Sequence, residues 1–407
     1  MLRLFRDRLE AAPLALRLLV CAALLKFLCS AVYLSWFTNG YDFALFHGAG
    51  ARVVSGQGAH VYDEFLSYRP ESENTLFFIY PPPVAVFYTP LGALPFQTAL
   101  NFFELLTQAA ILAVFLLWVR GRKIEPFSEP YYLALALILL FFPLDYSAQL
   151  GQNDALALLL LVLALFWRGR PLLFGLALAV AVCLKVFLGF LLLYLLLRRR
   201  WPEFFCAVFW LAVLAAASLA AVSGPVQVQY YARLGRELGI EAFYDNQSLT
   251  GLFYRALTDN GYTRGLCNAP ALARALTASS ALLLAGGFAW VTVRRGEGAS
   301  FEDGWGLALV TALLLSPHSD THHQAFLLIP LLLLLERRPV RTASLLYYGF
   351  FAAFIPVVAF RFLDRDRLVF FASGFRSLAY SIPVLVLLGF WFHCARHLGP
   401  APAPDRA

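Results

Sequence analysis

The feature that most constrains this chain is a succession of long apolar runs between Leu14 and Cys394. Their lengths suit helices of about 20 residues, enough to cross the hydrocarbon core of a bilayer. An outer-membrane barrel would show short segments of alternating hydrophobicity instead. Hydrophobic residues make up 60% of the 407 residues and charged residues only 14%, which excludes a soluble domain of this length. The sequence therefore predicts an all-α polytopic membrane protein.

Basic residues separate the apolar runs and set the expected topology, because Lys and Arg gather at the cytoplasmic ends of membrane helices. All basic turns can be cytoplasmic at once, which predicts about twelve spans with both termini inside. The first run, Leu14–Phe37, is too long for a signal-peptide core and counts as a span. The net charge of +7 fits this topology, so we expect no nucleic-acid partner. The basic turns are Arg3–Arg8, Arg120–Lys123, Arg168–Arg170, Arg198–Arg200, Arg294–Arg295, Arg337–Arg341 and the tail with Arg396.

We expect one transmembrane domain over residues 1–394 and a disordered, Pro- and Ala-rich cytoplasmic tail over 395–407. Two external segments, 37–82 and 223–270, are long enough to form short helices at the membrane interface. Shorter external segments are predicted at 144–152, 316–323 and 361–375.

The stretch Pro171–Leu197 has basic turns at both ends, yet it is too short for two crossings of a core about 30 Å thick. We predict two short helices that meet near Lys185, an arrangement tolerated where helices line a cavity. The alternative is one long tilted span with a snorkelling lysine.

The six cysteines show no disulfide framework and no paired metal-ligand spacing, because only Cys267 lies in a predicted aqueous loop. They are Cys21, Cys29, Cys183, Cys206, Cys267 and Cys394.

Asp42 follows the first span, in the sequence Gly40-Tyr41-Asp42-Phe43. A carboxylate at a membrane boundary, flanked by aromatic residues, is a candidate general base because partial desolvation raises its proton affinity. The alternative is an ordinary N-cap of the helical stretch Asp42–Ser55.

A second polar group, with Asp145, Gln149, Gln152, Asn153 and Asp154, runs into the start of a span and is expected to face a polar cavity. Lys185 is one of three lysines, and a phosphate is a natural partner for such an intramembrane cation. The alternative is a structural ion pair with Glu104 or Asp154.

Two more polar segments follow. Asn246–Gly251, with Arg255, has the pattern of a capped helix start. Ser316–Gln324 contains three histidines and Asp320. The three histidines and the aspartate could bind a metal, and His318 and His322 share one face if the segment is helical. The alternative is neutral histidines that donate to a phosphate or a sugar hydroxyl.

Taken together, these segments resemble glycosyltransferase family 87, the polyprenyl-phosphate-mannose-dependent mannosyltransferases of the GT-C superfamily. The resemblance extends from about Tyr41 to about Pro330 and implies a GT-C-like bundle with external interfacial helices. It rests on Asp42 with Gly56 and Tyr62, Tyr80-Pro81-Pro82 with Pro90-Leu91, Gly151-Gln152-Asn153, Leu184-Lys185, Asn246-Gln247-Ser248-Leu249 with Arg255, and Ser316-Pro317 with His322-His323.

The resemblance implies an inverting transfer in which Asp42 is the catalytic base. It implies that Lys185, Arg255 and His322 hold the donor phosphate, and that no metal and no cofactor is needed. The residues implied to bind the sugar or acceptor, by amide or imidazole hydrogen bonds or by aromatic stacking, are Tyr41, Phe43, Tyr80, Gln152, Asn153, Asn246, Gln247 and His323.

The sequence departs from the family in two places. Val186-Phe187-Leu188-Gly189 lacks the proline that usually follows the lysine, and Asp320 replaces a usual aromatic residue.

We expect mannose as the sugar, a lipid or glycan acceptor, and a plasma-membrane protein whose active site faces outside. A transporter or flippase is the alternative, but it would place polar groups near the midplane of related halves. A non-catalytic lipid-binding subunit is a third possibility.

Overall fold

The computed structural model describes residues 10, 12–37, 40–63, 65–66, 75–76, 78–237, 242–243, 245–260, 263–337, 340–354 and 379–399. The only strands in these ranges are β1 (Phe65–Leu66) and β2 (Thr75–Leu76), an antiparallel pair. Five described helical segments are long and apolar enough to cross a membrane, which confirms the all-α polytopic class. They are Leu14–Tyr33, Phe96–Gly121, Glu129–Leu150, Trp201–Ser218 and Pro270–Arg295.

The predicted number of about twelve spans and the position of the termini stay predictions. The basic turn Arg3–Arg8, the external segment 361–375 and the end of the tail, 400–407, lie outside the described residues.

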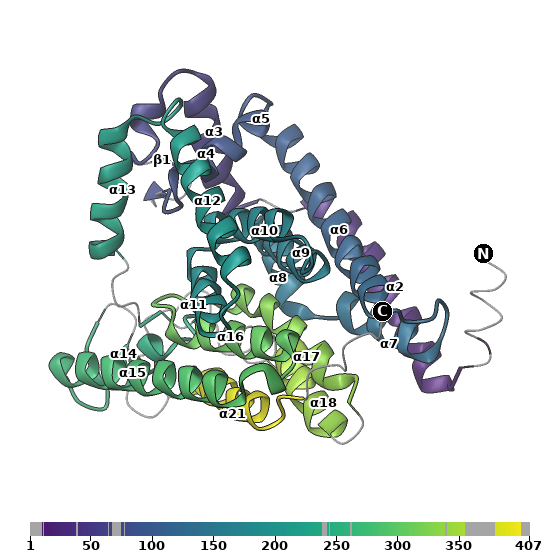
Figure 1. Ribbon diagram of the computed structural model, residues 1–407. Helices are drawn as coiled ribbons and strands as arrows, with labels where there is room; N and C mark the ends of the chain where they lie inside the picture. Colours follow the sequence, from purple (N-terminus) through teal and green to yellow (C-terminus); the bar gives the residue numbers. More distant parts are fainter. Residues whose placement is uncertain are drawn as a thin grey trace. The chain divides into compact units, whose positions relative to one another are not determined.

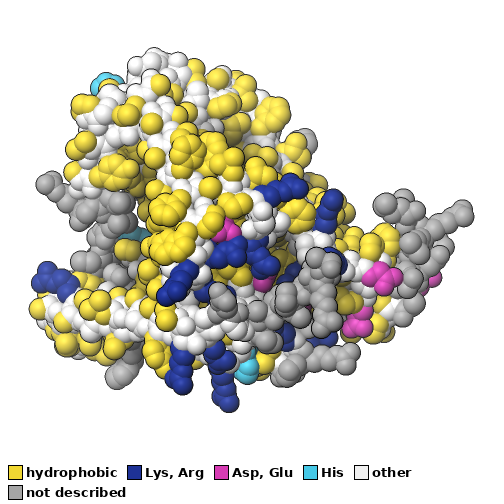
Figure 2. Space-filling view, in the orientation of Figure 1, with side chains coloured by type: hydrophobic (Ala, Val, Ile, Leu, Met, Phe, Trp, Pro, Cys, Tyr) yellow, Lys and Arg dark blue, Asp and Glu magenta, His cyan; other side chains and the backbone are white. Residues whose placement is uncertain are grey.

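Large apolar side chains are exposed along the long helices. Leu105 is 67% and Leu283 77% exposed, and Figure 2 shows hydrophobic side chains over much of the visible surface. Exposure of this kind is expected where the solvent is lipid, because lipid tails are as apolar as the side chains.

The chain divides into two compact units. The first unit comprises residues 1–186 and 205–237, and the second comprises 187–204 and 238–407. The first unit contains α2 (Leu14–Phe37), α3 (Phe43–Val54), η1 (Gly58–His60), α4 (Pro82–Phe87), α5 (Thr89–Gly92), α6 (Phe96–Gly121), α7 (Glu129–Leu139), α8 (Phe142–Leu150), α9 (Asp154–Phe166), α10 (Pro171–Leu184), most of α12 (Trp201–Ser218) and α13 (Gly224–Glu237).

Helix α9 packs between α6 and α10 in the first unit, and α2 packs along α7 (Figure 1). The predicted helical stretch after Asp42 is confirmed as α3, which lies against α5. Glycines permit this close approach, because a Cβ atom on Gly50 would lie 2.3 Å from the Tyr88 carbonyl oxygen. This part of the segment predicted to be external thus folds into the body of the unit, with eight residues of α3 buried.

The second unit is built around α16 (Phe301–Leu315), a helix that is apolar on almost every side and buried except at Glu302 and Leu315. A helix of this composition belongs in a core. Around it lie α11 (Phe190–Leu197), α14 (Leu249–Leu257), α15 (Pro270–Arg295), η4 (Thr321–Leu327), α17 (Leu328–Leu335) and α21 (Ile382–Arg396). The unit also contains η2 (Val186–Gly189, from Phe187 on), η3 (Gly296–Gly298), α18 (Arg341–Gly349) and the π-helix η6 (Phe350–Phe354).

The helix break predicted near Lys185 is confirmed. Helix α10 ends at Leu184, Lys185 is extended with φ −142° and ψ 96°, and η2 begins at Val186. A single long tilted span over Pro171–Leu197 is therefore wrong.

A second break, at Gly151, ends α8 with a left-handed residue of φ 72°. Most of the segment predicted to be external, 144–152, is helical and belongs to α8. A Cβ atom on Gly151 would lie 2.7 Å from the Phe43 Cβ and 3.2 Å from the Gly40 Cα. Glycine is thus required both by backbone conformation and by the close approach of the Asp42 segment.

Gly151→Ala is expected to lower the free energy of unfolding by about 1–3 kcal/mol, since alanine is strained at this φ and its methyl group meets Phe43. Gly169→Ala is the matched control, because a Cβ there meets nothing within 4 Å. Unfolding in detergent measures both, and equal stability of the two variants would contradict the expectation.

Candidate active site

One polar cluster of the first unit, here called the Gln152 cluster, brings together Asp42, Tyr80, Gln152, Asp154 and Lys185. The Gln152 side chain joins three of the others. Its Nε2 donates to Asp42 Oδ2 over 3.0 Å, and its Oε1 accepts from Tyr80 Oη at 3.0 Å and from Lys185 Nζ at 2.8 Å. The ammonium can only donate and a carboxylate can only accept, so these partners fix the orientation of the amide.

The carboxylate of Asp42 is positioned by its backbone as well as by Gln152. Its N–H donates to the Leu150 carbonyl oxygen over 2.8 Å, which ties the start of α3 to the end of α8. Asp42 occupies the N-cap position of α3, but its side chain makes no capping hydrogen bond. The alternative position at the N-cap is therefore confirmed, but the partly exposed side chain does not cap the helix and is directed to Gln152.

Lys185 forms an ion pair with Asp154, with Nζ 3.1 Å from Oδ1 and side chains 2% and 0% exposed. Ser147 Oγ donates to the other carboxylate oxygen over 2.9 Å. Of the two predicted carboxylate partners, Asp154 is the one found. A buried ion pair with these additional hydrogen bonds satisfies charges that would be costly alone.

Tyr80 is buried, with its ring against Phe46 at 4.7 Å and Phe78 at 5.7 Å between centroids. Burial, and then the charges of Asp42 and Asp154, raise the pKa of Tyr80 well above its usual value. The hydroxyl group therefore stays protonated and donates to Gln152. Lys185 Nζ lies 5.8 Å from the centroid of the Tyr80 ring.

The other predicted site residues of the first unit differ in exposure. Tyr41 is 39% exposed, whereas Phe43 is fully buried and stacks on Phe103. Asn153 is also fully buried, at the N-cap position of α9, beside Tyr88. Of these residues, Tyr41 thus offers an aromatic ring at the surface.

A second cluster, in the second unit, is organised by Asn246, and we call it the Asn246 cluster. Asn246 Oδ1 accepts from the backbone N–H groups of Ser248 and Ser319, at 3.2 and 3.0 Å, and Nδ2 donates to the Pro317 carbonyl oxygen over 2.8 Å. The Gln247 N–H donates to the Ser319 carbonyl oxygen over 2.7 Å. Two polar segments that lie far apart in the sequence, Asn246–Gly251 and Ser316–Gln324, are thus joined. The predicted capped helix start is confirmed, with Ser248 as the N-cap of α14.

Arg255 is fully buried in the same unit and binds the loop that carries Asn246. Nη1 donates to the carbonyl oxygens of Phe243 and Asn246, both at 2.7 Å, and Nε donates to Ser381 Oγ over 3.1 Å. Burial lowers the pKa of Arg255 to about 9, partly offset by Asp245. Burial also raises the pKa of Asp245, whose carboxylate accepts from Thr321 Oγ1.

The histidine segment is helical only in its second half. The 3₁₀-helix η4 begins at Thr321, so His318 precedes it and the condition for a helical face shared with His322 is not met. Asp320 is the N-cap, and His323 Nδ1 accepts from the Asp320 N–H at 3.1 Å in a capping box. The His323 ring also lies 5.2 Å from that of Phe187 and 4.2 Å from that of His322.

Asn246→Ala is expected to lower the free energy of unfolding by about 2 kcal/mol or more, because the N–H groups of Ser248 and Ser319 lose this acceptor and the Pro317 carbonyl keeps only its 3.3 Å hydrogen bond from Ser248 Oγ. Asn268→Ala is the matched control, since Asn268 accepts only a 3.3 Å hydrogen bond from the Asp259 N–H at an exposed loop. An Asn246→Ala protein as stable as the control would show that the amide does not hold the two segments together.

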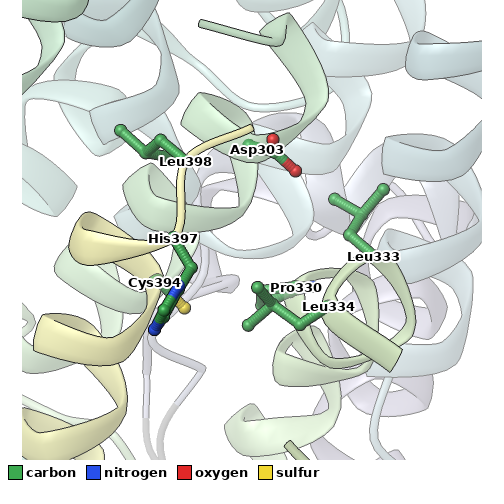
Figure 3. Close-up of a pocket in the computed structure, with 7 residues that line it drawn as sticks. All are labelled: Asp303, Pro330, Leu333, Leu334, Cys394, His397 and Leu398. Atoms are coloured by element: carbon green, nitrogen blue, oxygen red, sulfur yellow. The ribbon is translucent and has the colours of Figure 1, made fainter. Parts of the chain in front are cut away.

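A small pocket in the second unit lies at the opposite end of α16 from the Asn246 cluster. Its lining is mostly apolar, with Pro330, Leu333, Leu334 and Leu398 beside Asp303, Cys394 and His397 (Figure 3). Asp303 pairs with Arg337 and accepts from the Gly399 N–H over 2.8 Å. The pocket thus lies beside the contacts by which Asp303 binds Arg337 and the Gly399 backbone, and its lining contains none of the predicted site residues.

Two polar residues of the first unit were not predicted from the sequence. Ser147 donates to Asp154, and Lys26, in the middle of the first span, binds the Leu139 carbonyl and Asp145. Nothing in the sequence distinguishes Ser147 from other small residues of a helix. Lys26 could have been predicted, since a charged residue inside a span is a functional candidate by default.

The profile of glycosyltransferase family 87 matches residues 78–317. The polyprenol-phosphate-mannose-dependent α-(1-2)-phosphatidylinositol pentamannoside mannosyltransferase of Mycolicibacterium smegmatis is 29% identical over 354 residues, 84% of this chain and 82% of that protein. A protein of the same name from Mycobacterium tuberculosis is 29% identical over 79% of this chain and 73% of its own length. An α-(1→3)-arabinofuranosyltransferase of Mycobacterium tuberculosis is 32% identical over 42% of this chain and 39% of its own length. No solved structure matches the chain significantly.

Proposed function

Since the chain belongs to glycosyltransferase family 87 and is a polytopic membrane protein, it is a membrane glycosyltransferase, and we propose that its donor is a sugar linked to polyprenyl phosphate. Mannose is the first candidate for the sugar, because two relatives that match most of the chain are named as polyprenol-phosphate-mannose-dependent mannosyltransferases. The observation that carries the proposal is the Gln152 amide, which joins the Asp42 carboxylate to the Lys185 ammonium.

We assign Asp42 as the general base of an inverting, single-step transfer. The acceptor hydroxyl oxygen attacks the anomeric carbon, its proton passes to the Asp42 carboxylate, and the bond from the anomeric carbon to the phosphate oxygen breaks. The bonding electrons leave with polyprenyl phosphate. The backbone tie to Leu150 and the Gln152 hydrogen bond support this role, because they hold a partly exposed carboxylate in one position.

We assign Lys185 to the donor phosphate. A phosphodiester with one negative charge becomes a monoester with up to two as the sugar leaves, and a fixed cation stabilises the charge that develops. The Asp154 carboxylate and the Gln152 amide hold the ammonium in place before donor binds. His322 is assigned to the same phosphate on the family resemblance.

The contacts favour positioning roles for three residues first assigned to substrate. The polar atoms of Gln152 serve Asp42, Tyr80 and Lys185, so we propose that Gln152 orients the base. Asn246 and Arg255 hold their loop through buried backbone contacts. Positioning residues of this kind lower catalysis through geometry when they are changed.

Direct contact with the sugar or acceptor is assigned to residues whose role rests on the resemblance. The exposed ring of Tyr41 is suited to stack on a sugar face. The others are Tyr80, Asn153, Gln247 and His323. We propose a plasma-membrane location with both termini in the cytoplasm, an active site that faces outside, and a lipid or glycan acceptor, without a metal or another cofactor.

The proposal is tested with purified protein in liposomes. Radiolabelled sugars on polyprenyl phosphate, mannose first and then glucose and arabinose, are supplied with glycolipid and glycan acceptors. Nucleotide-linked mannose is the control donor. We expect labelled acceptor from a lipid-linked donor and none from the nucleotide-linked one. Transfer only from the nucleotide-linked donor would overturn the proposal, as would movement of the lipid-linked sugar across the bilayer without a covalent product.

A further inference from the structure

Lys26 lies in the middle of a helix that is long and apolar enough to cross a membrane. Lys26 is the thirteenth of the 24 residues of α2, and its Nζ donates to the Leu139 carbonyl oxygen over 2.8 Å and forms an ion pair with Asp145. The two side chains are 32% and 15% exposed. An ionisable side chain in the apolar stretch of a candidate membrane-spanning helix is costly, so such a residue is a candidate for a role.

The two acceptors of Lys26 lie on either side of a break between helices. Helix α7 ends at Leu139, and α8 begins at Phe142 with Pro143 in its first turn. In a continuous helix the Leu139 carbonyl would accept from the N–H of residue 143, but proline has none. Lys26 supplies the donor that Pro143 lacks, and Asp145 fixes the ammonium from the α8 side.

The other end of α8 carries the Gln152 cluster. Helix α8 ends at Leu150, whose carbonyl accepts from the Asp42 N–H, and Gln152 follows after Gly151. Leu150 follows Asp145 by five positions in the helix, a rise of about 7.5 Å. Because α8 is this short, we expect a shift of its first turn to move the Gln152 amide and the Leu150 carbonyl that binds the Asp42 backbone.

We propose that Lys26 is a positioning residue, which fixes the break between α7 and α8 and thereby the register of Gln152 against Asp42. The assignment rests on the proposed function in one respect, because it takes Asp42 to be the group whose position matters for transfer. The contacts of Lys26 with α7 and α8 do not depend on which reaction the protein catalyses.

The test compares four full-length variants in liposomes: Lys26→Met, Lys26→Arg, Lys26→Met/Asp145→Leu and Lys123→Met. Lys26→Met alone leaves the Asp145 carboxylate without its cation and could fail to fold for that reason. The double variant removes both charges of the pair, so it can be tested even if the single variant does not fold. Lys26→Arg keeps donors for both acceptors. Lys123 is exposed in a basic turn and serves as the lysine control.

We expect the double variant to lower kcat at least about 10-fold with an unchanged donor KM, because a small misplacement of a base costs rate rather than binding. Lys26→Arg is expected to keep most of the wild-type kcat. Hydrogen–deuterium exchange of the peptide that contains Asp42 is expected to be faster in the double variant and unchanged in Lys123→Met. This second measurement needs no activity, so it tests the bracing even if the proposed reaction is wrong.

Wild-type kcat together with wild-type exchange in the double variant would overturn the proposal. A rise in donor KM alone, with unchanged exchange, would overturn it as well, since that pattern would place Lys26 in donor binding.

Discussion

Asp42→Asn is expected to lower kcat by about 10²- to 10⁴-fold, the usual contribution of a general base. The substitution keeps the shape of the side chain, removes its negative charge and its ability to take a proton, and leaves one amide oxygen that can accept from Gln152. The backbone tie from Asp42 to Leu150 does not involve the side chain and should persist. We therefore expect a folded protein with near-normal donor KM and almost no turnover, measured by transfer of labelled sugar.

Asp63→Asn is the matched control for this change. Asp63 belongs to the same predicted external segment, is 53% exposed and pairs with His60 at 2.7 Å, apart from the Gln152 cluster. It should transfer sugar at the wild-type rate. Equal activity of the Asp42 and Asp63 variants would remove Asp42 from the mechanism.

Lys185→Met is expected to lower the free energy of unfolding by about 3–5 kcal/mol, because it leaves the Asp154 carboxylate buried without its cation. The Asp154 side chain is fully buried, and Ser147 alone cannot neutralise it. The measurement is unfolding in detergent, and transfer activity should be lost as well.

The double variant Lys185→Met/Asp154→Leu separates stability from function. With both charges replaced by apolar groups, most of the stability should return. Activity should stay absent, since the cation assigned to the leaving phosphate is still missing. Activity that returned with stability would show that Lys185 serves only the fold.

The helical membrane class was predictable because it follows from composition and run length. The break at Lys185 was predictable for a similar reason, since two basic turns lie too close for two spans. The break at Leu140–Phe141 was missed although Pro143 was in view, because prolines often begin helices and the missing donor shows only when a partner is found. Lys26 supplies that donor from a residue 113 positions away.

The site was predictable as a set of residues, and much less so as a set of contacts. Asp42 and Gln152 were both singled out, but their hydrogen bond links positions 110 apart and depends on how α3 meets the end of α8. Arg255 shows the opposite case. The resemblance implied that it binds a phosphate, whereas its donors bind two backbone carbonyls and the Ser381 hydroxyl of its own unit. Its burial could not be predicted from a single polar helix turn. The separation of His318 from His322 followed from Pro317 and the Ser-Asp-Thr turn, which stop a helix before Thr321.

The central claim is a single displacement at the anomeric carbon, assisted by Asp42. It is tested most directly by nuclear magnetic resonance of the anomeric centre, in a polyprenyl-phosphate mannose of defined configuration and in the product that the wild-type protein forms from it. We predict opposite anomers in donor and product. A product with the same anomeric configuration as the donor would contradict the account, because a single attack from the side opposite the leaving phosphate inverts the anomeric carbon.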